Sequence, residues 1–188
     1  MKSFAILSLA AAAVAAPTSS NSKRQTPPAT IDPLLSQYNV ATGAVTYNTG
    51  EGYIFKKNGA EPDITTLMSF KFPDSTEGYN CEILFPLDAA STATGSQRAQ
   101  VFSGLKPAAE TTTTWPSGNL RDQHLGDVKF EAPGGAVYEA TYGPYAQGKF
   151  PCPAGYKLGA ELVGRWDEVT VAWTQGAGAG PYIEVTAA

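Results

Sequence analysis

Alternation of apolar and polar residues is the feature that most limits how this chain can fold. Residues 64–72 place Met68, Phe70 and Phe72 on one side of an extended chain, because successive side chains of a strand point to opposite faces. Residues 168–174 alternate in the same way. No window carries an apolar stripe at helical spacing that is long enough for a substantial helix. We therefore expect the apolar residues to be buried by sheets.

Strand patterns of this kind recur at short intervals. They cover residues 43–48, 52–57, 64–72, 79–85, 97–103, 127–131, 137–142, 157–163, 168–174 and 182–185. Sequences rich in Gly, Pro and Asn separate them, and the first two are predicted to pair as a hairpin around residues 49–51. About ten short antiparallel strands predict an all-β fold, a β-sandwich with a jelly-roll-like arrangement.

The first 24 residues differ in composition from the rest. Residues 1–16 have a basic start, a short apolar run and small residues at the end, which predicts a signal peptide. Residues 17–24 form a polar leader that ends in the dibasic pair Lys23-Arg24, so we expect a second cleavage before Gln25. Residues 25–188 contain no repeat or linker and are predicted to form one domain. We expect this product to be secreted, without membrane attachment.

The charge of the expected product is acidic. Removing Lys2, Lys23 and Arg24 leaves 10 of the 13 basic residues against 17 acidic ones, a net charge of −7. Such a surface repels nucleic acid and anionic lipid. We expect neither as a partner.

The two cysteines are predicted to form a disulfide. Cys81 lies in an apolar strand pattern, and Cys152 lies between Pro151 and Pro153, which remove backbone donors on both sides of it. In an exported chain two cysteines are most simply bonded to each other. The bond would join a core strand to a stiff turn. No basic side chain adjoins either cysteine, so we expect a structural bridge and no redox activity.

Enzyme signatures are mostly absent. His124 is the single histidine, which rules out a metal site built from several histidines, and the chain has no Gly-x-Ser-x-Gly motif. His124, Arg121 and Asp122 share a polar stretch that we interpret as a structural loop. We predict no catalytic residue, no metal and no cofactor.

Paired carboxylates leave a glycan-active hydrolase as an alternative. The candidates are Asp167 with Glu168, and Glu131 or Glu139 on predicted strands. Adjacent residues of a strand face opposite ways, so Asp167 and Glu168 pair poorly there. We interpret these carboxylates as outward, solubilising groups.

Aromatic residues favour a different alternative, a carbohydrate-binding module. Trp115 and Trp166 fall in predicted loops, and Tyr142 and Tyr145 flank a Gly-Pro turn. Rings at such places either stack on sugars or pack over sheet edges. Trp173 alternates with valines and is assigned to the core. We take Trp115, Trp166, Tyr142 and Tyr145 as the candidate ligand-stacking residues.

Several short motifs carry a family resemblance. They are Thr65-Thr-Leu67, Phe70-Lys-Phe72, Gly78-Tyr-Asn-Cys81, Trp115-x-x-Gly-Asn-Leu-Arg-Asp-Gln123, Phe150-Pro-Cys-Pro-Ala-Gly155 and Gly180-Pro-Tyr-Ile183. Together they resemble the fungal domain catalogued as "ubiquitin three binding protein But-two, C-terminal domain", over residues 30–186. The resemblance implies a small fungal protein, secreted or associated with the cell wall, and it supplies no catalytic residues.

Taken together, these features predict a secreted, non-enzymatic fungal protein that acts in the extracellular medium or at the cell wall. Its expected partners are cell-wall polysaccharide or another extracellular protein. The enzyme to which the family description points works in the cytosol, a compartment that an exported, disulfide-bonded chain does not share. We therefore do not expect a ubiquitin-pathway enzyme as a partner.

Overall fold

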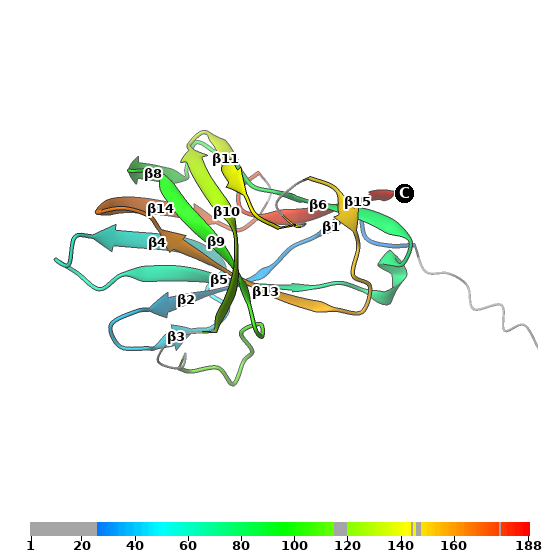
Figure 1. The fold of residues 1–188 in the computed structure, drawn as a ribbon, viewed down its shortest axis with the longest axis horizontal. Coiled ribbons are helices and arrows are strands. Elements are labelled where there is room, and N and C mark those ends of the chain that lie inside the picture. The colour runs from blue at the N-terminus through cyan, green and yellow to red at the C-terminus, as the bar shows by residue number, and fades with distance from the viewer. Residues whose placement is uncertain (1–25, 115–119, 144, 146–147, 177) are drawn as a thin grey trace, which may run out of the picture.

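Two antiparallel sheets make up the described part of the chain (Figure 1). The computed structural model describes residues 26–114, 120–143, 145, 148–176 and 178–188. The smaller sheet has the order β1 (Thr30–Ile31), β15 (Tyr182–Ala187), β6 (Tyr79–Leu84) and β12 (Phe150–Pro151).

The larger sheet has eleven strands. Nine of them follow one path: β7 (Pro86–Leu87), β11 (Gly134–Thr141), β10 (Arg121–Glu131), β9 (Arg98–Gly104), β13 (Lys157–Gly164), β5 (Ile64–Lys71), β4 (Glu51–Lys57), β14 (Glu168–Thr174) and β8 (Thr92–Gly95). The strand β2 (Leu34–Asn39) also pairs with β5, and β3 (Val45–Thr46) pairs with β2. In Figure 1 these strands fan out toward one end, and β1, β6 and β15 lie together at the other.

The prediction of an all-β antiparallel fold is confirmed. The described residues contain fifteen strands and one short 3₁₀ helix, Asp74–Thr76. Four strands, β1, β3, β7 and β12, are only two residues long, which explains why about ten were expected from pattern alone. Between the sheets lies a sandwich-like core in which Phe70 and Phe130 are buried. Trp173, assigned to the core, is 3% exposed.

The predicted hairpin around residues 49–51 is wrong. The strand β3 pairs with β2, whereas β4 pairs with β14 over seven positions, from Glu51 opposite Thr174 to Lys57 opposite Glu168. Gly50 has a φ of 67°, which turns the chain away from β3. The distant strand β14 buries more of β4, because it brings Val169, Val171 and Trp173 into the core.

The strand β2 was not predicted, because both of its faces are buried. Leu35 lies in the main core, and Tyr38 lies on the other side of the sheet in a second, smaller cluster with Leu67 and Ala108. Burial of both faces removes the alternation that marks a half-exposed strand. Residues 105–114 cover part of this outer face, and Ser69 donates a hydrogen bond to the carbonyl oxygen of Ala108.

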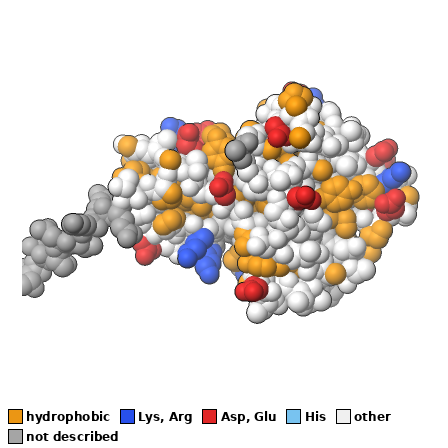
Figure 2. All heavy atoms as spheres, turned by 180° about the vertical axis from the view of Figure 1, so that it is seen from behind, with side chains coloured by type: hydrophobic (Ala, Val, Ile, Leu, Met, Phe, Trp, Pro, Cys, Tyr) orange, Lys and Arg blue, Asp and Glu red, His pale blue; other side chains and the backbone are white. Residues whose placement is uncertain are grey.

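In the described ranges, no helix is long and apolar enough to span a membrane. On the face opposite to that of Figure 1, hydrophobic side chains form patches that are bordered by acidic and basic ones (Figure 2).

Candidate functional site

The disulfide between Cys81 and Cys152 is present, as predicted. The two Cα atoms lie 5.1 Å apart, and the bond spans 71 residues of sequence. Cys81 is completely buried on β6, and Cys152 follows the edge strand β12. Pro151 has no backbone N–H to donate to a neighbouring strand, and an edge strand tolerates this. The backbone N–H of Cys152 donates to the carbonyl oxygen of Tyr79. The bridge therefore closes the edge of the smaller sheet.

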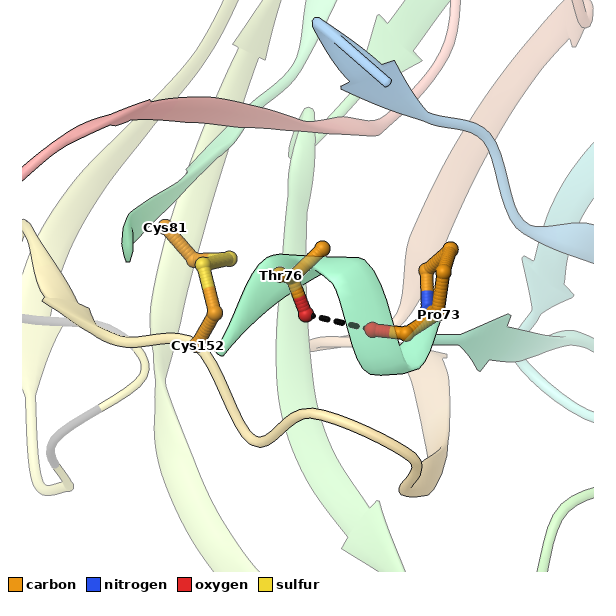
Figure 3. The surroundings of a disulfide bond; sticks show 4 residues. All are labelled: Pro73, Thr76, Cys81 and Cys152. Atoms are coloured by element: carbon orange, nitrogen blue, oxygen red, sulfur yellow. Dashed lines mark hydrogen bonds between the residues drawn. A yellow bond between two sulfur atoms is a disulfide. The ribbon is translucent and has the colours of Figure 1, made fainter. Parts of the chain in front are cut away.

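The surroundings of the bridge are structural (Figure 3). The short helix Asp74–Thr76 passes beside it, and the buried hydroxyl of Thr76 donates to the carbonyl oxygen of Pro73 at 2.7 Å. Both bridged cysteines are buried, and buried structural cysteines are unreactive.

A line of aromatic and charged side chains crosses the outer face of the larger sheet. We call it the outer-face cluster, and it consists of Arg98, Phe102, His124, Asp127, Tyr142, Arg165 and Trp166. Two strands, β9 and β10, supply four of its members, and the other three directly follow the ends of β11 and β13. Asp127 pairs with Gln100 and His124 with Phe102 across the β9–β10 ladder, so these side chains share one face.

Trp166 forms one end of the cluster. The guanidinium carbon of Arg98 lies 4.8 Å from the centre of the indole, and that of Arg165 lies 5.2 Å from it. The ring nevertheless remains 53% exposed. Trp166 has a φ of 70°, in the left-handed region, where a bulky side chain costs roughly 1–2 kcal/mol. The chain thus holds an exposed indole in a strained position.

The two arginines are themselves held by carboxylates. Arg98 donates two hydrogen bonds to Glu139, at 2.7 and 2.8 Å, and Arg165 lies 2.8 Å from Asp127. The bonds from Arg98 hold the pKa of the Glu139 carboxyl below its ordinary value. Glu139 is the residue skipped where the β10–β11 register shifts, which leaves it without a direct cross-strand partner.

Asp127 and His124 occupy the centre of the cluster. The Nε2 atom of His124 lies 3.1 Å from the carbonyl oxygen of Gly126 and 3.3 Å from Oδ1 of Asp127. A carbonyl only accepts, so Nε2 carries the proton. That hydrogen bond goes to Gly126, and the buried Oδ1 is left without a hydrogen-bond partner among the described residues.

Three neighbouring rings form the other end. His124 lies 4.9 Å from Phe102, nearly parallel to it, and 4.9 Å from Tyr142 on its other side. Tyr142 is 59% exposed. From Arg98 to Phe102 the strand covers roughly 13 Å, at about 3.3 Å per residue. The cluster is therefore long enough to contact a ligand of more than one sugar ring, and it has an exposed aromatic residue at each end.

The remaining stacking candidates lie elsewhere. Tyr145 is half-buried and meets Phe150 edge-on at 4.9 Å, next to the main core. Trp115 lies outside the described residues. The stacking role of Trp115, Trp166, Tyr142 and Tyr145 stays a prediction, and of these rings the cluster contains Trp166 and Tyr142.

Two of the candidate hydrolase carboxylates are held by basic side chains. Glu131 binds Lys129, and Glu139 binds Arg98. Glu168 begins β14 and is exposed, and the carbonyl of Asp167 accepts the backbone N–H of Asn58. Within the described ranges, His, Cys, Asp and Glu side chains nowhere assemble in threes as metal ligands.

Sequence reasoning missed several members of the cluster. Arg98, Phe102 and Asp127 were not singled out, and His124 was placed in a loop although it lies on β10. The available signal was a carboxylate and a histidine amid the apolar run of residues 124–130. Sequence reasoning also missed Tyr53 and Phe55, whose rings stack at 5.8 Å beside an open hollow of about 320 Å³.

Comparison with known proteins identifies one family. Residues 48–178 match the model of the "Ubiquitin 3 binding protein But2 C-terminal domain", a range that holds both cysteines and the whole outer-face cluster. No curated protein and no solved structure matches the chain. The family is not a known enzyme family, and its description is that of a binding domain. The chain belongs to the family of the ubiquitin 3 binding protein But2 C-terminal domain.

Proposed function

We propose that the protein is an exported, non-catalytic binding protein that attaches to cell-wall polysaccharide through the outer-face cluster. One observation carries this proposal. Trp166 is kept exposed in a left-handed backbone conformation by two arginines, on the same sheet face as the exposed Tyr142. Strain that the surrounding structure maintains at an exposed residue is a mark of functional sites.

The chemistry of the cluster suits a neutral polysaccharide. Aromatic faces pack against the apolar faces of sugar rings, as Tyr and Trp do wherever one side of a ligand is apolar and the other is wet. Gln100 lies opposite Asp127 on the same face, and the carboxylate of Glu139 is partly exposed beside Arg98, so both supply hydrogen-bonding groups to a ligand there. Because both arginines are already paired with carboxylates, an acidic ligand gains little there.

The disulfide supports export. Bonds of this kind persist in oxidising compartments and are rare in the cytosol. Residues 1–16 as a signal peptide, residues 17–24 as a leader and residues 25–188 as the mature domain remain part of this proposal. The same compartment argument is why we do not propose a ubiquitin-pathway partner.

Hydrolysis has less support. A glycosidase needs a carboxylic acid whose pKa is raised, so that it is protonated when it meets the substrate. The pKa of Glu139 is shifted the opposite way by Arg98. A binding role requires no such acid.

Pull-down on insoluble chitin, β-glucan and cellulose tests the proposal. We expect the protein to bind at least one polymer, and Trp166→Asn to weaken that binding by at least about tenfold. Asparagine tolerates the left-handed region, so this change removes the ring without adding strain. Tyr156→Ala is the matched control, because Tyr156 is 55% exposed but lies beyond the disulfide turn, outside the cluster.

Four results would count against it. Absence of binding to all three polymers, or equal binding by Trp166→Asn, removes the outer-face cluster as the site. Release of reducing sugar from the same polymers contradicts the non-catalytic role. The intact mass of protein from the culture medium checks processing: a chain starting at Gln25 is expected, and a retained Met1 contradicts export.

A further inference from the structure

An apolar cavity of about 100 Å³ lies between the two sheets, apart from the outer-face cluster. Strands β5, β9, β10 and β13 of the larger sheet line one side of it, with Met68, Val101, Leu125 and Leu158. From the smaller sheet comes the end of β6. Almost every lining side chain is a hydrocarbon, so the interior offers a water molecule few hydrogen-bond partners.

The position of the opening follows from the exposure of the lining residues. Those on β5, β10 and β13 are buried, whereas Leu84 on β6, Tyr138 on β11 and Tyr145 are half-exposed. The strands β6 and β11 belong to different sheets, and the gap between them is bounded at one end by Phe85, the residue after β6, whose carbonyl oxygen accepts the backbone N–H of Ala136 on β11. The cavity therefore opens between these two strands, at the rim of the sandwich.

Tyr138 places a polar group among these apolar side chains. Its hydroxyl forms no hydrogen bond with the described residues. Burial raises the pKa of Tyr138 to about 12, so the hydroxyl is protonated at neutral pH and able to donate. Among the described residues, Asp127 Oδ1 is the one buried side-chain oxygen or nitrogen without a partner, so the Tyr138 hydroxyl is reached by solvent at the rim, where the polar group of a ligand can replace water as its partner.

We propose that this cavity binds the aliphatic end of a small molecule whose single polar group hydrogen-bonds with Tyr138, such as a straight-chain alcohol. The volume agrees with this class, since an apolar cavity of about 150 Å³ stays dry and binds benzene. A cavity of about 100 Å³ accepts a shorter or thinner apolar group. The site is independent of polysaccharide binding, because none of its lining residues belongs to the outer-face cluster.

Met68 makes the proposal directly measurable. The chain contains two methionines, Met1 and Met68, so protein labelled at the methionine methyl with ¹³C gives at most two signals. Met68→Leu assigns the one from the cavity. On titration with 1-hexanol, we expect a saturable shift of the Met68 signal, with a nuclear Overhauser effect from the hexanol chain to that methyl. Tyr138→Phe should weaken hexanol binding while leaving the response to xenon unchanged.

A matched pair of variants completes the test. Ala136→Leu fills the cavity and should abolish the shift, whereas Ala140→Leu, on the same strand but opposite Asp127, should preserve it. Absence of a Met68 shift up to the solubility limit overturns the proposal. A shift that persists in Ala136→Leu also overturns it, because the alcohol then binds elsewhere. If Ala136→Leu does not fold, the Overhauser effect in the unaltered protein decides: without it, the site is refuted.

Discussion

Arg121 donates hydrogen bonds to both carboxylate oxygens of Glu161, at 2.9 and 2.8 Å, and so ties the first residue of β10 to the middle of β13. Glu161 is 2% exposed, and the hydroxyl of Thr65 donates a third bond to it at 2.7 Å. The carboxylate is thus removed from water but fully bonded. Arg121 also covers the ring of Phe102 at 5.3 Å, which connects this buried pair to the outer-face cluster.

Removal of this arginine should be costly. Arg121→Met leaves the carboxylate of Glu161 buried without its cation, and we expect a loss of about 2–4 kcal/mol in the free energy of unfolding. Denaturant titration measures it. Arg98→Met is the matched control, since Arg98 also binds a glutamate through two bonds, but the Glu139 side chain is 35% exposed. There we expect a clearly smaller loss, because water screens an exposed ion pair. Equal losses in the two variants would contradict this account.

The disulfide should stabilise the fold without defining it. In the double variant Cys81→Ala with Cys152→Ala, we expect a loss of about 2–4 kcal/mol, because the unfolded chain regains the freedom of a 71-residue loop. The far-ultraviolet circular dichroism of the folded state should remain that of the parent. A reducing agent should lower the melting temperature of the parent and have no effect on the double variant. Loss of the β spectrum in the absence of denaturant would show instead that the bridge is needed for folding.

Gly52 is required by the core. A Cβ atom at this position would collide with the six-membered ring of Trp173, which pairs with Gly52 across the β4–β14 ladder. We expect Gly52→Ala to cost about 1–3 kcal/mol through overpacking. Adding Trp173→Phe should recover part of that loss, because the smaller ring makes room for the methyl group. A double variant whose loss equals the sum of the two single losses would argue against the collision.

Alkaline pH should destabilise the protein through Tyr138. Its pKa is raised by burial to about 12 in the folded state, against 10.0 without burial, so the folded protein holds this proton more tightly than the unfolded chain does. The contribution is complete below pH 10 and is lost as the pH rises toward 12, amounting to at most about 3 kcal/mol. Tyr138→Phe should flatten the decline in unfolding free energy over that range. If the two proteins decline equally, the shift does not arise at Tyr138.

The sequence by itself determined the class of fold and its covalent bridge. Period-two alternation in residues 64–72 and 168–174 marks β5 and β14 nearly to the residue, because each has a face that only a core can bury. The prolines around Cys152 excluded it from a central strand, and it follows an edge strand. These properties are local, because they depend on the residues of one segment and not on the strands with which it pairs.

Tertiary structure decided which strands became neighbours. The hairpin expected at residues 49–51 was the local choice, but β4 pairs with β14, more than a hundred residues later, because that pairing buries Trp173 over Gly52. The strand β2 escaped prediction because each of its faces meets a different apolar cluster. Neither outcome can be deduced from one stretch of sequence, because the stabilising burial depends on apolar surfaces that distant segments of the chain supply.

The outer-face cluster shows the same division. Trp166 and Tyr142 were recognisable as candidate rings from their loop positions, yet no sequence pattern joins them to Arg98, Asp127 and Phe102. They meet because β9 lies between β10 and β13, and because the register shift at Asp127 skips Glu139 in the ladder. Local sequence specifies the period and the turns, whereas the lateral order of strands is set by burial over the whole chain.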